Sequence, residues 1–229
     1  MPESEDGASS QAGATPARRG ASSTEPTAAR DGGTHAASAP DDLTERVVDT
    51  TVIHRGRYLE FRIDTIERSD GSRSKRDIVG HPGAVAILAL DDEDRVLLVR
   101  QYRVAASAAL LEIPAGTLEV DAGTTEEPDG AAARELEEET GYRANRWQHL
   151  GSFWTAPGFA TERMHLYLAE DLVAADIDRL GPDEDEHLQL ERLPWRDAVA
   201  AAERGEIEDA KSLVALFWLA RLRADQPAR

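Results

Sequence analysis

The chain has 229 residues, no cysteine and a formal net charge of -18. It is long enough for a domain with an ordinary hydrophobic core. The lack of cysteine excludes disulfides, thiolate catalysis and cysteine-based zinc sites, and the negative charge makes nucleic acid and anionic membranes poor partners. No stretch approaches the roughly 20 apolar residues of a membrane span, and no apolar signal-peptide core is present, so we expect a cytoplasmic protein.

Composition divides the chain into a tail, a small strand unit and a larger domain. Residues 1–42 are rich in Ala, Ser, Gly, Thr and Pro and contain almost no large apolar residue, which predicts a disordered tail. Residues 43–81 are expected to form an antiparallel strand unit that is marginal alone and must pack on something. Its predicted strands are 47–54, 58–68 and 76–81, with a turn at 69–72.

Residues 82–224 are predicted to form the main domain, followed by a short tail at 225–229. Strands interleaved with a few helices indicate an α/β (α+β) fold whose mixed sheet is covered on both faces. Apolar runs and alternation predict strands at 85–90, 96–101, 110–114, 147–153, 164–169 and 188–193, and helical periodicity predicts helices at 129–140, 195–204 and 209–224.

The predicted helix at 129–140 has a cluster of carboxylates. Glu135, Glu138 and Glu139 have helical i, i+3 and i+4 spacing, so they share one face and repel one another. Arg134 is adjacent in sequence but is expected to point elsewhere, so a divalent cation such as Mg²⁺ would offset the repulsion. The alternative is a solvated acidic face, which in so acidic a chain is the first expectation for any glutamate cluster.

Residues on both sides of this cluster favour the metal site. Pro128 suits the first turn of a helix and Gly141 suits a left-handed helix end. Together with an upstream Pro-Ala-Gly loop, the segment resembles the signature of the Nudix family: Gly, five residues, Glu, seven residues, Arg-Glu, an aliphatic, any residue, Glu-Glu, any residue, Gly, an aliphatic. The chain matches this signature at Gly116, Glu126, Arg134, Glu135, Leu136, Glu138, Glu139 and Gly141.

The chain departs from the signature at two places. Nine residues separate Gly116 from Glu126, where the family has five. The additional residues fall in a predicted loop, where insertions cost little, but they leave the path of the loop and the role of Glu126 open. Tyr142 stands where an aliphatic residue is usual.

The resemblance implies a Nudix α/β/α sandwich and a magnesium-dependent pyrophosphohydrolase, with Mn²⁺ as a possible substitute. By position, Glu135 and Glu139 resemble the main metal ligands, Glu138 a further ligand and the Ala115 carbonyl a backbone ligand. Arg134 resembles the residue that orients these carboxylates.

A general base is implied as well. In relatives that act on ADP-ribose it resembles a glutamate in a loop after the acidic helix, and residues 182–188 occupy that place. Glu186 is the first candidate and Glu184 the second. A solvated acidic loop is the equal alternative for each.

ADP-ribose is the substrate that the resemblance favours. Pro157 follows Tyr142 by fifteen residues, as a proline does in that subgroup, and with Gly116 it is expected near the substrate. Arg103 resembles a phosphate contact, and Arg100 is either a second contact or a surface residue. Cleavage would give AMP and ribose 5-phosphate.

Two further expectations follow from the same subgroup. Glu112 resembles an auxiliary metal ligand, with a structural role as the equal alternative. The strand unit resembles one that is exchanged between the subunits of a homodimer and lines the adenine pocket. Tyr58 or Phe61 could stack on adenine, although a core or interface role is the first expectation for both.

Other readings stay open. The substrate could be GDP-mannose, ADP-glucose or a dinucleotide, which a substrate panel would decide. The chain could be a non-catalytic module that senses ADP-ribose, although its glutamates are intact, or an acidic interaction protein, which magnesium and ADP-ribose would not stabilise.

Overall fold

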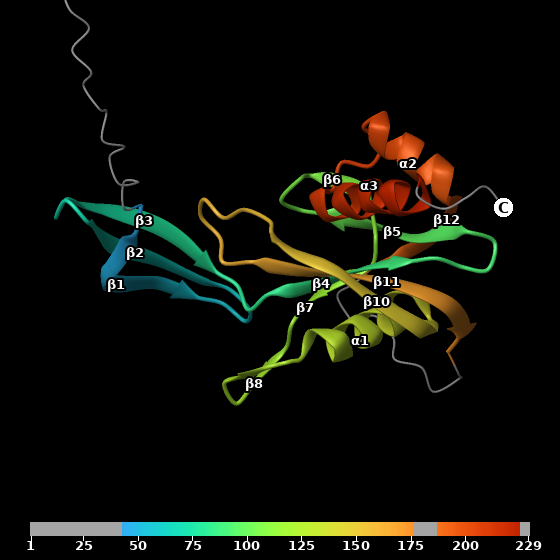
Figure 1. Cartoon of the computed structure of the whole chain (residues 1–229). Helices are drawn as coiled ribbons and strands as arrows, with labels where there is room; N and C mark the ends of the chain where they lie inside the picture. The colour runs from blue at the N-terminus through green and yellow to red at the C-terminus, as the bar shows by residue number, and fades with distance from the viewer. Residues whose placement is uncertain (1–42, 176–186, 225–229) are drawn as a thin grey trace, which may run out of the picture. The chain divides into compact units, whose positions relative to one another are not determined.

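The computed structural model of the chain describes residues 43–175 and 187–224, all within one compact unit, Asp42–Arg229. Within these residues no helix is long and apolar enough to cross a membrane. The element order begins with three strands, continues through a central group of strands around the first helix, and ends with two helices (Figure 1).

The N-terminal strands form an antiparallel sheet in the order β1 (Glu45–Arg55), β2 (Glu60–Arg68) and β3 (Arg73–Gly80). On one face Asp64 and Ile66 are buried, at 5% and 3% exposure. The face that carries Phe61 is open instead, with Phe61 at 37%. Part of the apolar surface of this sheet is therefore left uncovered by residues 43–175 and 187–224.

The main domain contains two groups of hydrogen-bonded strands, in the orders β10-β11-β4-β7 and β12-β5-β6. Strand β4 is buried along its whole length and runs parallel to β11, while the other pairs in these two groups are antiparallel. The mixed sheet expected from the sequence is confirmed. The strands are β4 (Ala84–Ala89), β5 (Arg95–Arg103), β6 (Ala108–Glu112), β7 (Ala115–Thr117), β10 (Tyr142–Trp154), β11 (Arg163–Ala174) and β12 (Gln189–Pro194).

Strands β10 and β11 are longer than predicted, because backbone pairing carries them beyond their apolar residues. Their register runs from Tyr142 opposite Ala174 to Trp154 opposite Arg163. The added ends are largely exposed and polar, so the apolar pattern could not reveal them.

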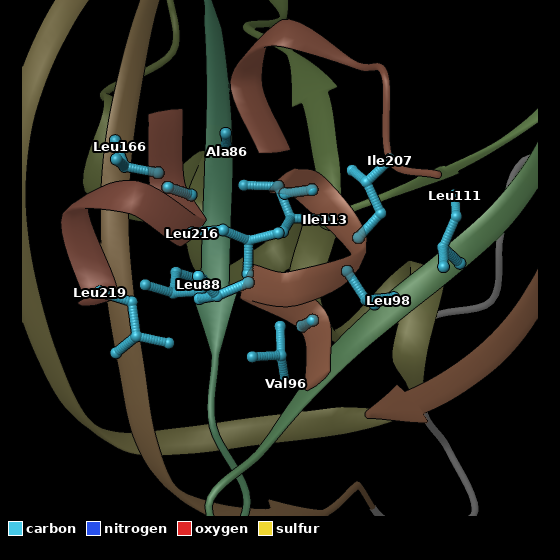
Figure 2. Packing of buried hydrophobic residues seen from close by; sticks show 14 of the residues in the cluster. Ala86, Leu88, Val96, Leu98, Leu111, Ile113, Leu166, Ile207, Leu216 and Leu219 are labelled. Carbon is cyan, nitrogen blue, oxygen red and sulfur yellow. The ribbon is translucent and has the colours of Figure 1, made fainter. Parts of the chain in front are cut away.

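Helices cover both faces of the strands, as Figure 1 shows. Helix α1 (Pro128–Thr140) packs on one face, and α2 (Trp195–Glu203) and α3 (Ala210–Ala224) pack on the other. Alternate residues of β4 supply the two cores: Val85 and Ile87 face α1, whereas Ala86 and Leu88 face α3. Figure 2 shows the second core, where Leu88 and Leu216 meet. The α/β/α sandwich is confirmed.

Helix α1 begins and ends as its sequence predicts. Pro128 occupies the first turn, where a missing N–H costs nothing. Gly141 has a φ of 73°, and its N–H donates to the Glu137 carbonyl over 2.8 Å. This left-handed end fixes where the helix stops and β10 starts.

The residues added between Gly116 and Glu126 form a small exposed hairpin of β8 (Val120–Asp121) and β9 (Thr124–Thr125). Ala122 and Gly123 connect the two strands with φ values of 48° and 83°, as the tightest hairpin turns require. The Glu126 N–H then donates to the Glu119 carbonyl over 2.8 Å. Because the hairpin returns to its starting point, the insertion leaves Glu126 beside the helix.

Candidate active site

A cavity of about 550 Å³ opens between the second half of α1, β6 and the start of α3. This volume lies within the range of small-molecule sites. Carboxylates of α1 line one part of it and basic residues of β5 and α3 line another. The lining residues used below are Tyr58, Arg103, Glu112, Ala115, Gly116, Arg134, Glu135, Glu138, Thr155, Glu162, Asp209 and Lys211.

Gly116 lies in the short strand β7, where the sequence led us to expect a loop, and it allows this strand to press against α1. A Cβ on Gly116 would stand 1.9 Å from the carboxyl carbon of Glu135, so the Glu135 carboxylate would have to move from its present position. The backbone of β7 and the Glu135 carboxylate can lie this close because residue 116 has no side chain. This contact brings the Ala115–Gly116 backbone to the acidic face.

The expectation that Arg134 points away from the glutamates is wrong. Its Nη1 donates to Glu135 and Glu138 over 2.8 Å each, and its Nη2 donates to Glu126 over 2.9 Å. The side chain is long enough to fold back over its own helix turn, and Glu138 is its i+4 neighbour. Burial alone would lower the pKa of Arg134, but the hydrogen bond to Glu126 and the charge of Glu135 outweigh it and raise the pKa.

The same contacts give Glu126 a position. Burial acts to raise the pKa of its carboxyl, but the hydrogen bond from Arg134 is stronger in effect and the pKa is lowered. Glu126 therefore accepts from Arg134 as a carboxylate at neutral pH. Glu126 therefore lies next to Arg134, although the segment between Gly116 and Glu126 is longer than in the signature.

The oxygen atoms in the acidic part of the cavity suit a hard divalent cation. Glu135, Glu138 and Glu139 are carboxylates, and the Ala115 N–H donates to Glu139 over 3.0 Å, which holds the start of β7 at the helix. Within residues 43–175 and 187–224 no three acidic or histidine side chains are arranged so that together they could hold a metal ion. Magnesium does not need such a cage, because it keeps several waters and takes one or two carboxylates. The residues present fit a hydrated divalent ion.

The opposite part of the cavity is built around Glu112, which is 2% exposed. Arg103 donates to both of its oxygens over 2.8 Å each, and Lys211 contacts one of them. Burial acts to raise the pKa of Glu112, but Arg103 and Lys211 outweigh it and the pKa is lowered. The carboxylate is thus buried as an anion with two cations.

Two of the predicted substrate contacts lie elsewhere. Arg100 pairs with Glu191 of β12 over 2.6 Å and does not line the cavity. Pro157 lies in the loop after β10, and the lining includes Thr155 from this loop but not the proline. The two candidate bases, Glu184 and Glu186, lie outside the described residues.

Other lining residues were not identified from the sequence. Lys211 and Asp209 lie at the start of α3. The sequence feature that could have identified them is an aspartate just before a predicted helix, followed by one of only two lysines in the chain. Glu162 accepts from Thr155 over 2.5 Å across the loop after β10. Tyr58 was considered, and it lines the cavity, whereas Phe61 does not.

A glycine of β7 held against an acidic helix whose carboxylates an arginine bridges, on an α/β/α sandwich, agrees with the signature that the chain carries. Residues 80–216 match the family model of the NUDIX domain. This match covers more than half of the chain, and the chain therefore belongs to the Nudix family. It is a Nudix hydrolase, and hydrolases of this family generally need a divalent metal.

Three similar proteins align with most of the chain. The ADP-ribose pyrophosphatase of Bacillus subtilis (strain 168) is 40% identical over 77% of this chain and 93% of its own length. The methanol dehydrogenase activator of Bacillus methanolicus is 41% identical over 76% and 92%. The GDP-mannose pyrophosphatase of Cronobacter sakazakii is 34% identical over 67% and 83%.

A solved structure described as an ADP compounds hydrolase has the same fold. It superposes with a TM-score of 0.68 at 26% identity, over 81% of this chain and 97% of the other. The superposition therefore spans nearly all of that enzyme.

Proposed function

We propose that this Nudix hydrolase cleaves ADP-ribose to AMP and ribose 5-phosphate. The observation that carries the proposal is the 40% identity to an ADP-ribose pyrophosphatase across 93% of that protein. A second such enzyme, from Mycobacterium tuberculosis, is 36% identical over 80% of its length. The proposal includes the cytoplasmic location expected from the sequence.

The charges of the cavity suit a diphosphate. In the reaction the oxygen of a water forms a bond to one phosphorus while the bridging P–O bond breaks, and a proton is released. Arg103 faces the cavity with a guanidinium that pairs well with phosphate oxygens. The carboxylates of α1 would repel the same oxygens unless a cation lay between them.

Magnesium is the proposed ion, with Mn²⁺ as a substitute. Glu135, Glu138, Glu139 and the Ala115 carbonyl are the groups that would hold it, and Arg134 would keep two of these carboxylates in place. When bound, such an ion supplies positive charge for the developing phosphate charge and a more acidic water. Both oxygens of Glu112 already accept from cations, which favours its structural role.

Glu186, and Glu184 after it, stay proposed as the general base. A Gln variant of the true base should lose turnover while KM stays close to that of the wild type, and the acidic limb of its pH–rate profile should disappear. If neither variant changes the profile, the base lies elsewhere.

A homodimer is proposed as well. Strand β1 has 11 residues and lies at the edge of its sheet, and long exposed edges readily pair with another chain. Ile53, Leu59 and Phe61 add exposed apolar surface to this unit at 52%, 46% and 37%. Sedimentation should give twice the mass of the chain, and Phe61→Glu should shift it toward monomer. A monomeric wild type would contradict this.

The alternative keeps the chemistry and changes the nucleotide. GDP-mannose pyrophosphatases are 32–34% identical to the chain over 67–68% of it, so a GDP-sugar is the second candidate. The groups proposed to contact the diphosphate do not distinguish adenine from guanine, because they would contact only phosphate oxygens and the metal ion.

Product analysis tests the proposal. The purified protein is incubated with Mg²⁺ and ADP-ribose, ADP-glucose, GDP-mannose or NADH, and nucleotides are separated at early times. AMP formed fastest from ADP-ribose is the expected result. Faster release of a monophosphate from another substrate would move the assignment, and no cleavage of any of the four would overturn it.

A further inference from the structure

Lys211 is a buried lysine at the wall of the cavity. It lies in the first turn of α3 and is 8% exposed, whereas lysines are almost never fully buried unless paired. Its ammonium contacts the carboxylates of Glu112 and, over 3.0 Å, Asp209.

Lys211 is one member of a row of alternating charges. Asp209, Lys211, Glu112 and Arg103 follow one another, each in contact with the next. Glu112 is the deepest member at 2% exposure, while the side chain of Arg103 is 41% exposed at the open end. The row therefore leads from the buried start of α3 to the surface of the cavity.

The open end presents a guanidinium in a fixed orientation. Arg103 uses Nε and Nη2 to bind both oxygens of Glu112, and this fork-to-carboxylate geometry fixes the plane of the group. Its Nη1 has no hydrogen bond to any residue in the described parts of the chain. An oxyanion in the cavity can accept from that edge without displacing Glu112.

The buried end is anchored to Ile113, between β6 and β7. Asp209 accepts from the backbone N–H of Ser212 over 3.0 Å and from its hydroxyl over 2.6 Å, as a helix-capping aspartate does. The Ser212 hydroxyl in turn accepts from the Ile113 N–H over 2.8 Å. The first turn of α3 is thus tied to the end of β6.

We propose that Lys211 is a positioning residue for substrate binding: it holds Glu112, and through Glu112 it holds the Arg103 guanidinium toward the diphosphate. This inference rests on the proposed function, because it takes from it that Arg103 binds a phosphate of the substrate. Helix α3 is then part of the substrate site as well as of the core.

A double-mutant cycle tests whether Lys211 acts through Arg103. Lys211→Met, Arg103→Ala and the double variant are assayed with ADP-ribose and saturating Mg²⁺. Each single change should lower kcat/KM by about ten- to a hundredfold, mainly through KM, because a charge-assisted contact is lost. The double variant should be no worse than Arg103→Ala alone. Effects that multiply would overturn the proposal, as would a loss confined to kcat.

Lys75→Met is the matched control, because Lys75 is the other lysine and is exposed on β3. It should leave both kinetic constants unchanged. Lys211→Met leaves Glu112 with one cation fewer and can cost enough stability to unfold the chain. In that event Glu112→Gln, which keeps the side-chain shape, replaces it in the cycle with Arg103→Ala, and the same non-additivity is expected.

The cycle separates this proposal from the substrate assignment. If the wild type cleaves GDP-mannose or ADP-glucose instead of ADP-ribose, the cycle is run with that substrate, since each carries a diphosphate. If nothing is cleaved, calorimetric affinity for ADP-ribose with Mg²⁺ takes the place of KM. Additive losses in affinity, or no binding by the wild type, would overturn the role of Lys211.

Discussion

Gly116 and Glu135 lie so close that a Cβ on the glycine would stand 1.9 Å from the carboxyl carbon of the glutamate. The two residues are 19 positions apart in the chain, on either side of the hairpin insertion. Their contact joins the backbone of β7 to the acidic face of α1. The candidate metal site depends on this contact, because it brings a carbonyl and carboxylates together.

Gly116→Ala should therefore reduce turnover strongly, since either β7 or Glu135 must move. Steady-state kinetics and a melting curve measure the effect. Gly130→Ala is the control: Gly130 lies in α1, and a Cβ there meets nothing within 4 Å. It should raise stability by about 0.5–1 kcal/mol and keep activity. Normal turnover of Gly116→Ala would argue against a site at this contact.

Glu139→Gln should keep the fold and lower turnover more than about a hundredfold, because even outer partners of a metal cost 10–100-fold when changed. The amide oxygen of glutamine can still accept from the Ala115 N–H, so melting without metal should change little. The Mg²⁺ concentration for half-maximal rate should rise. A variant with near-normal rate and metal dependence would remove Glu139 from the proposed ligands.

Arg134→Lys should lower both stability and turnover. One ammonium cannot replace a guanidinium that bridges Glu126, Glu135 and Glu138. We expect a loss of about 1–3 kcal/mol in the free energy of unfolding, measured by urea denaturation without metal. Added Mg²⁺ should restore more stability to this variant than to the wild type. Glu126→Gln, which removes one partner only, should have the smaller effect on both properties.

His81 makes stability depend on pH below neutrality. Burial lowers the pKa of its imidazole below 6.5, although the Glu162 carboxylate acts in the opposite direction. Its Nδ1 accepts from the Gly83 N–H over 3.0 Å, which requires an unprotonated nitrogen. The contribution of His81 is fully present above the unfolded pKa near 6.5, and it is lost as pH falls through the lower folded pKa.

The test of this pH dependence compares melting temperatures at pH 8 and pH 5.5. Wild type should lose more stability on acidification than His81→Asn, since asparagine keeps an acceptor for the Gly83 N–H but does not titrate. His149→Gln, at an exposed histidine of β10, should behave as the wild type does. Equal losses in all three proteins would contradict the assignment.

The sequence by itself determined the class of the protein and the acidic half of its candidate site. Helical spacing placed Glu135, Glu138 and Glu139 on one face, and Pro128 and Gly141 marked the ends of α1 within a residue. These features depend only on residues that are close in sequence along one helix, so the sequence pattern is enough to predict them. The apolar runs gave the strands that are buried, and the mixed sheet with helices on both faces followed from their order.

Only the tertiary structure decided where the second half of the site lies. Glu112 and Lys211 are 99 residues apart, and no pattern along the chain pairs a strand carboxylate with a lysine of the last helix. Helical spacing placed the Arg134 side chain away from the glutamates, and only the family resemblance gave it an orienting role. Spacing gives the direction of Cα–Cβ bonds, whereas a long side chain folds toward the charges around it. Burial of charge depends on what packs around it, and packing joins segments that are distant in sequence.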